Sequence, residues 1–265
     1  MNKELWTSLG VLFIFLMTTL GSALVFVFKK DFSPNFKRIF LGFASGIMIA
    51  ASIFSLLLPA INEPVDYMPS WLVVAIAFLL GCLFLFMIDK IVPHIHKGSN
   101  EEEGVKTRKM KSSTKMFLAV LIHNIPEGLA VGLAFGLVFS GSGDSDALLM
   151  SALMLALGMG LQNFPEGAAV SLPMMEELKS KPKAFLYGTL TGIVEPIAAV
   201  VGIFLSMYIQ GIMPWALAFA AGCMIYVTVE ELIPEAQLDN KNHLGTWACI
   251  AGFLVMMVLD IALAF

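Results

Sequence analysis

Hydrophobic residues along this 265-residue chain are gathered into eight long runs, and short polar segments separate them. A helix needs about 20 mostly apolar residues to cross the hydrocarbon core of a bilayer, and the runs approach or exceed that length. The pattern therefore predicts an all-α integral membrane protein with eight transmembrane helices. The runs cover approximately residues 8–28, 39–61, 71–89, 115–139, 146–172, 184–209, 213–235 and 245–264.

The composition favours the same class of protein. Hydrophobic residues make up 58% of the chain and charged residues 14%, whereas charged residues supply about a quarter of a typical soluble domain. We expect one transmembrane domain over residues 1–265. The longest connection, about 90–114, is charged and poor in apolar residues, which predicts a flexible loop. Its two histidines, His94 and His96, lie near the glutamates at 101–103, an arrangement more typical of a solvated loop than of a metal site.

Basic residues are distributed unevenly between the two sides of the predicted membrane domain. All 16 lysines and arginines except Lys3 lie in or beside the connections after the first, third, fifth and seventh runs. Because positively charged loops stay in the cytoplasm, these four connections are predicted to be cytoplasmic and both termini extracytoplasmic. The alternation also supports the number of runs, and we expect the protein in the cell membrane, inner or plasma.

Two segments of the chain resemble each other although they run in opposite directions. FASGIMIAASIFSLL at 43–57 is similar to FAAGCMIYVTVEELI at 219–233. The first segment would run outward through the membrane and the second inward. Opposite direction is the signature of an inverted repeat, an arrangement common in transporters. We therefore predict that runs 1–3 are related to runs 6–8 around kinked helices in runs 4 and 5.

A polar hexapeptide occurs twice inside the apolar runs, as HNIPEG at 123–128 and QNFPEG at 162–167. In each copy the glutamate follows the first residue by four positions and the second by three, so it is a neighbour of both on the helix surface. Each copy also carries a proline, which removes a backbone donor and favours a kink. Irregular backbone at membrane depth is tolerated where it lines a cavity or is buried in protein.

These polar residues have the chemistry of a metal site. Ionisable groups within a bilayer are costly, so each is a candidate for function. Helices 4 and 5 side by side would bring together an imidazole, three carboxamides and two carboxylates, and Glu195 in the sixth run could add a third carboxylate. Nitrogen and oxygen ligands without thiolate fit a first-row divalent ion held reversibly, whereas a structural zinc site is more often closed and rich in cysteine. A hydrogen-bonding role for His123 and a proton relay through the glutamates are alternative interpretations.

The paired hexapeptides in an eight-span chain resemble the ZIP family of divalent metal transporters. QNFPEG followed by AAVSLPM is most similar to the GufA-like branch, and GIVEP and VEELIPEA extend the resemblance over nearly the whole chain. It implies two metal positions halfway across the membrane, with Glu127 and Glu166 bridging them. The ligands of the first position would be His123, Glu127, Gln162 and Glu166. Those of the second would be Asn124, Glu127, Asn163, Glu166 and Glu195.

The resemblance also implies roles for residues beyond the hexapeptides. Met48 matches a residue that lines the first position in related bacterial members, although a methionine also fills gaps between helices. Glu231 lies where the family has a pathway carboxylate. Some members carry aspartate where Asn163 stands, so this chain has less negative charge at the second position. The resemblance further implies an elevator-like slide of spans 1, 4, 5 and 6 against spans 2, 3, 7 and 8.

The function predicted from the sequence is transport of divalent metal cations into the cytoplasm, and not catalysis. Zn²⁺ is the expected substrate, with Cd²⁺, Fe²⁺ and Mn²⁺ as alternatives, and no cofactor is expected. The expected partners are metal ions, the lipid bilayer and a second copy in a homodimer, and no nucleic acid. A proton-coupled carrier of a non-metal solute is one alternative. An intramembrane metallo-enzyme is another, although the zinc-protease motif H-E-x-x-H is absent from the sequence.

Overall fold

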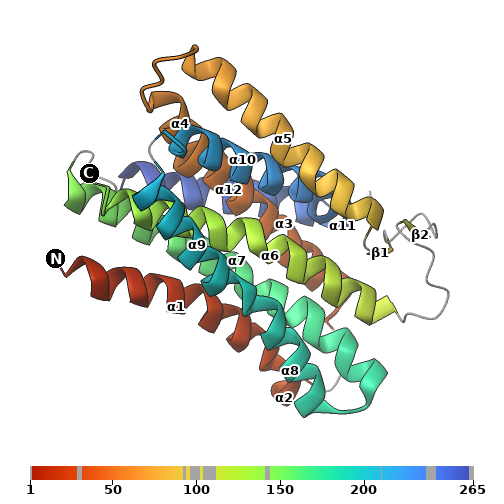
Figure 1. The fold of residues 1–265 in the computed structure, drawn as a ribbon. Coiled ribbons are helices and arrows are strands. Elements are labelled where there is room, and N and C mark those ends of the chain that lie inside the picture. Colours follow the sequence, from red (N-terminus) through yellow and green to blue (C-terminus); the bar gives the residue numbers. More distant parts are fainter. Residues whose placement is uncertain are drawn as a thin grey trace.

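The computed structural model describes residues 2–28, 32–91, 94–95, 102–103, 112–140, 144–209, 211–236 and 243–262. Within these ranges the chain is a bundle of helices, shown in Figure 1. Eight helical segments are long and apolar enough to cross a membrane, which confirms the prediction of eight spans. The described part of the loop at 90–114 contains a two-residue antiparallel pairing of β1 (His94–Ile95) with β2 (Glu102–Glu103). His96 and most of that loop lie outside the described residues.

Spans 1–4 have these bounds: span 1, α1 (Lys3–Ser22) and α2 (Leu24–Val27); span 2, α3 (Pro34–Ala51), η1 (Ser52–Leu57) and α4 (Leu58–Asn62); span 3, α5 (Ser70–Ile91); span 4, α6 (Ser112–Leu137). Spans 5–8 follow: span 5, α7 (Ser145–Leu178); span 6, α8 (Lys181–Gly192) and α9 (Val194–Tyr208); span 7, α10 (Met213–Val227), η2 (Thr228–Leu232) and α11 (Ile233–Ala236); span 8, α12 (Leu244–Ala262).

Polar residues in the connections begin several of these helices. The side chains of Asn2 and Ser33 accept hydrogen bonds from the backbone amides three residues later, at 3.0 and 3.3 Å. The side chain of Asp144 accepts from the backbone amide of Asp146, two residues later, at 2.9 Å. Such caps satisfy backbone donors that have no partner within the helix. The helix starts are therefore determined locally, by the residues that interrupt the apolar runs.

Helix packing confirms the inverted repeat. The most extensive contacts join α1 to α7, α6 to α9, α3 to α12 and α5 to α10. In terms of spans, these pairs are 1 with 5, 4 with 6, 2 with 8 and 3 with 7. Exchanging spans 1–3 with 6–8, and span 4 with 5, converts the first pair into the second and the third into the fourth. We call spans 1, 4, 5 and 6 the site group and spans 2, 3, 7 and 8 the frame group.

Glycines permit the closest of these contacts. A Cβ atom added to Gly46 would lie 1.9 Å from the carbonyl oxygen of Cys249, and one added to Gly222 would lie 2.1 Å from that of Phe78. Either distance is far shorter than an atom-to-atom contact allows, so only glycine fits at these positions. The two glycines occupy corresponding places in the repeat segments, and each holds its span against another helix of the frame group.

Both repeat segments contain a short π-helix, which the hydrophobic pattern does not reveal. These are η1 in span 2 and η2 in span 7, and they begin at the corresponding residues Ser52 and Thr228. Each of these hydroxyls donates to the carbonyl oxygen four residues earlier, Met48 and Met224 respectively, at 2.7 Å. Short π-helical turns inside α-helices are frequently found at functional sites.

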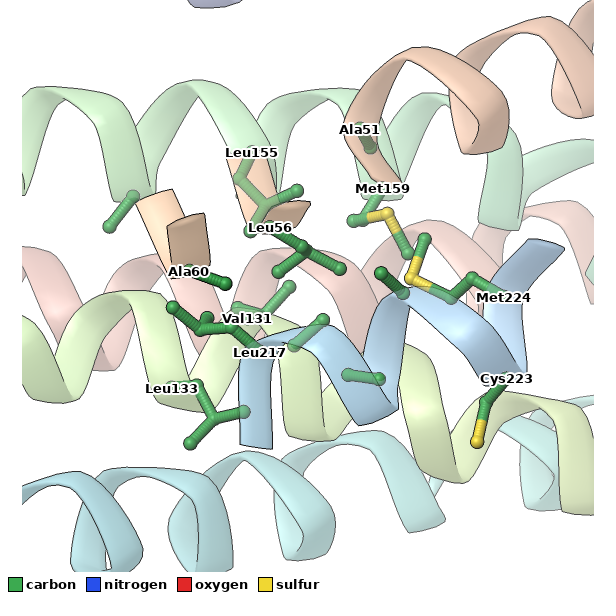
Figure 2. Close-up of a cluster of buried hydrophobic side chains, with 14 of the residues drawn as sticks. Ala51, Leu56, Ala60, Val131, Leu133, Leu155, Met159, Leu217, Cys223 and Met224 are labelled. Carbon is green, nitrogen blue, oxygen red and sulfur yellow. The ribbon is translucent and has the colours of Figure 1, made fainter. Parts of the chain in front are cut away.

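A buried apolar cluster fills the bundle between spans 2, 4, 5 and 7 (Figure 2). Leu56, Val131, Leu155 and Leu217 are 0% exposed. Val131 is eight residues beyond His123 along α6, or about 12 Å at 1.5 Å per residue. If the termini are extracytoplasmic, as the basic residues predict, this cluster lies between the hexapeptides and the outer side of the membrane.

Candidate metal site

The two hexapeptides face each other at the centre of the bundle. Helices α6 and α7 continue through Pro126 and Pro165 without interruption, so each proline removes one backbone donor but does not end its helix. The polar side chains of both motifs are withdrawn from the surface: His123 is 5% exposed and Glu127, Gln162 and Asn163 are 2% or less. Polar groups at such depth require partners.

Glu195 lies at the centre of one hydrogen-bond network. Its Oε1 accepts from Thr18 Oγ1 at 2.9 Å and from Asn124 Nδ2 at 3.0 Å. Its Oε2 accepts from Asn163 Nδ2 at 2.6 Å. The side chain is 0% exposed, and these three donors are uncharged. The negative charge of Glu195 is therefore solvated by dipoles from spans 1, 4 and 5.

Gln162 connects the two hexapeptides. Its Nε2 donates to Glu127 Oε2 at 2.5 Å and to Asn163 Oδ1 at 2.6 Å. An ionised carboxylate can only accept hydrogen bonds, so the amide nitrogen is the atom of Gln162 that faces Glu127. The positive end of an amide dipole thus lies between two oxygens that would also attract a cation.

Asn124 carries an acceptor without a partner. Its Nδ2 donates to the carbonyl oxygen of Thr191 and to Glu195, both at 3.0 Å. Its Oδ1 is buried and accepts no hydrogen bond from the part of the chain that the structure describes. A buried, unpartnered acceptor is costly, and a cation would satisfy this oxygen without any rotation of the amide.

Glu231 in η2 brings the frame group to the cluster. Its Oε1 lies 3.3 Å from His123 Nε2. Glu166 is half-buried, and the carboxylates of Glu127 and Glu231 are near enough to act on it electrostatically. Carboxylates of spans 4, 5, 6 and 7 thus come together here. Glu231 contacts the imidazole of His123, and Glu127 and Glu195 accept hydrogen bonds from the amides of the motifs. Among the described residues, however, no three His, Cys, Asp or Glu side chains stand close enough together to share one ion.

Sequence comparison identifies the family to which this arrangement belongs. A family model described as ZIP zinc transporter matches residues 4–117 and 105–260. The chain is 35% identical to zinc transporter ZIP11 of Homo sapiens, over 96% of each chain. It is 35% identical to zinc transporter ZupT of Streptococcus mutans over 92% of each, and 36% identical to zinc transporter GufA of Myxococcus xanthus over 79% of this chain and 80% of that one.

The chain belongs to the ZIP zinc transporter family. The resemblance drawn from the hexapeptides is therefore confirmed, including a relative of the GufA type. The proteins that it matches are named as transporters, which agrees with transport and not catalysis as the class of function. The ligand assignments at the two predicted metal positions stay predictions, although all seven predicted ligand residues come from the helices that meet here.

Two ZIP residues outside the hexapeptides, Glu231 and Met48, are predicted from the family to line the pathway, and the structure places Glu231 beside the cluster. Glu231 contacts His123, as described above. Met48 is 2% exposed, and its sulfur lies 3.7 Å from Thr228 Oγ1. Met48 of span 2 therefore packs against span 7, its counterpart in the inverted repeat, and its role at the first metal position stays a prediction.

Thr18 is the residue of this ZIP site that sequence reasoning missed. The signal was present, because Thr18 and Thr19 form a polar pair within the apolar run of span 1. A hydroxyl in a transmembrane helix usually bonds to its own backbone, so the pair attracts little attention. Only the packing of α1 against α9 reveals that one hydroxyl reaches a glutamate 177 residues away.

Proposed function

We propose that this chain carries divalent metal ions, Zn²⁺ above all, across the membrane into the cytoplasm through two adjacent metal positions in the site group. The three relatives compared above are each named as zinc transporters, which supports zinc as the substrate. Cd²⁺, Fe²⁺ and Mn²⁺ offer similar coordination, and their order of preference follows from geometry and availability as much as from ligand type.

The observation that carries the proposal is the buried acceptor of Asn124 within a cluster of carboxylates. An ionised carboxylate at the centre of a bilayer costs about 3 kcal/mol or more on insertion scales. Glu127 and Glu195 are both 2% exposed or less, and their charges act on each other. A divalent cation offsets this repulsion and satisfies the free oxygen of Asn124, so its arrival stabilises the cluster.

Binding requires one identifiable rearrangement. The amide nitrogen of Gln162 lies between Glu127 and Asn163, and it must withdraw before an ion can approach those oxygens. Rotation of the same amide would present Oε1 of Gln162 as a ligand. Because Glu127 and Glu166 lie on facing helices, each can then contribute to both positions, as the two-metal arrangement of the family implies.

The proposed direction of transport rests on the place of the apolar cluster and on the orientation that the basic residues predict. The apolar cluster of spans 2, 4, 5 and 7 separates the site from the outer side, given extracytoplasmic termini.

Contacts are most extensive within the site group and within the frame group, rather than between the two. We therefore propose an elevator-like movement in which the site group slides as a unit along the frame group, with Glu231 near the cytoplasmic exit.

Uptake into proteoliposomes tests the proposed function directly. We expect the purified chain to take up Zn²⁺ saturably, with competition by Cd²⁺, Fe²⁺ or Mn²⁺ added in excess. A parallel series with a pH gradient measures any coupling to protons. Counterflow of a non-metal solute without metal uptake would overturn the proposal in favour of a proton-coupled carrier. Zinc binding with hydrolysis of a peptide or lipid, and no uptake, would favour a metallo-enzyme.

Replacement of His123 by alanine is expected to weaken zinc uptake at low substrate concentration. The imidazole is the sole nitrogen ligand predicted for the first position. Loss of a group that supports a bound metal typically lowers the metal affinity of a site by about 10–100-fold. We expect KM for zinc to rise by at least about tenfold. His243→Ala is the matched control, because His243 is exposed at the start of α12. An unchanged KM in the His123 variant would contradict its assignment as a ligand.

A further inference from the structure

One donor to Glu195 comes from outside the set of candidate ligands. Thr18 Oγ1 lies 2.9 Å from Glu195 Oε1, and both residues are 0% exposed. A hydroxyl has a single hydrogen to donate. Its other acceptor, the carbonyl oxygen of Ile14, is farther away at 3.4 Å. The carboxylate is therefore the principal acceptor of the Thr18 hydroxyl.

Thr18 differs in kind from the other donors to this carboxylate. Asn124 and Asn163 are candidate ligands, so their amides must serve the ion as well as Glu195. The hydroxyl of Thr18 has no such second task. It can hold Oε1 while an ion approaches Oε2, which accepts from Asn163. Holding one oxygen determines the rotamer of the glutamate and therefore the direction of the other oxygen.

Close helix contacts prevent Thr18 from moving away. A Cβ atom added to Gly192 would lie 2.8 Å from Thr18 Cβ, and one added to Gly167 would lie 2.1 Å from the carbonyl oxygen of Thr18. Span 1 is thus pressed against spans 5 and 6 at this residue. The hydroxyl is presented to Glu195 by backbone packing and not by a flexible side chain.

The inverted repeat explains why these two side chains meet. Gly167 of the second hexapeptide packs on the carbonyl oxygen of Thr18, and Gly128 of the first packs in the same way on that of Glu195. Thr18 and Glu195 are therefore counterparts in the two repeats, and their side chains meet between spans 1 and 6. One repeat contributes the carboxylate, and the other contributes the hydroxyl that orients it.

We propose that Thr18 is a positioning residue that orients Glu195 for metal binding and thereby raises the affinity of the second metal position. This inference rests on the proposed function. It assigns to span 1 a direct influence on the site, and it predicts that the influence acts through Glu195 alone.

Zinc titration of the purified full chain in detergent by calorimetry tests the proposal. The metal position that depends on Glu195 is first defined as the one whose zinc affinity falls in the Glu195→Gln protein. In Thr18→Val, which keeps the shape and removes the hydroxyl, we expect its affinity to fall by about 10–100-fold, the range for groups that orient metal ligands. Thr18→Ser retains the donor and is expected to stay within about threefold of the original chain in this affinity.

Two further measurements separate positioning from general damage. Thr19→Val is the matched control, because the buried hydroxyl of Thr19 has no partner among the described residues, and we expect unchanged zinc affinity. In the Glu195→Gln background, Thr18→Val should cause no further loss, because coupled residues give non-additive effects. An equal further loss in that background would overturn the proposal, as would original affinity in Thr18→Val itself.

Folding and metal binding are checked independently. If Thr18→Val does not purify as a folded protein, Thr18→Ala is judged by the same criteria. If the original chain binds no zinc at all, the proposed function fails and this inference fails with it. If the original chain binds zinc and the Thr18 variants bind equally well, only the inference is wrong.

Discussion

Glu127→Ala is expected to reduce zinc uptake in proteoliposomes to the level of liposomes without protein. Glu127 is predicted to contribute to both metal positions, so its loss removes a ligand and a negative charge from each. The change also leaves Gln162 without its carboxylate acceptor, and the amide can then turn toward Asn163 alone. A divalent ion leaving water would meet too little compensating charge to enter the membrane.

Glu127→Gln separates the charge from the shape, because the amide fills nearly the same space. We expect it to fail almost as completely as alanine if the charge is decisive. Glu176→Gln is the matched control, since Glu176 is exposed near the end of α7, and we expect normal uptake. Normal uptake by both Glu127 variants, at equal protein content, would show that the site has been assigned wrongly.

Gly128→Ala is the second change for which we expect a large effect, on stability as well as transport. The added Cβ would lie 2.3 Å from the carbonyl oxygen of Glu195 and 2.6 Å from its Cα. Those atoms belong to the backbone of α9, so span 6 must move away from span 4. Overpacking of this kind typically costs about 1–3 kcal/mol, and the movement withdraws Glu195 from Asn124.

Thermal unfolding in detergent and zinc uptake measure the two consequences of Gly128→Ala separately. We expect a lower unfolding temperature and uptake well below that of the original chain. Ile125→Ala serves as the control, because Ile125 lies on the same helix and is 42% exposed, where a smaller side chain changes little packing. Unaltered unfolding temperature and uptake in Gly128→Ala would mean that spans 4 and 6 are not packed as described.

The hydrophobic pattern was sufficient to predict the eight spans, because they depend on composition over long stretches, and the similarity of residues 43–57 to 219–233 was sufficient to predict the inverted repeat. The candidate ligands were predictable because polar residues within apolar runs are conspicuous. The π-helix at Ser52 was not predictable, because a change in the hydrogen-bond pattern of a turn alters neither length nor hydrophobicity. The contact between Thr18 and Glu195 depends on tertiary packing, and so does the orientation of the Gln162 amide.

The matching π-helices carry a consequence for the history of the chain. A π-turn accommodates one more residue than the α-helical turn that it replaces. In both repeats it begins at the corresponding residue, Ser52 or Thr228, and the two segments align up to that point without a gap. Two independent insertions at one register are a less economical history than a single one. The shared register is what duplication of one half-length segment that already contained the π-turn would produce.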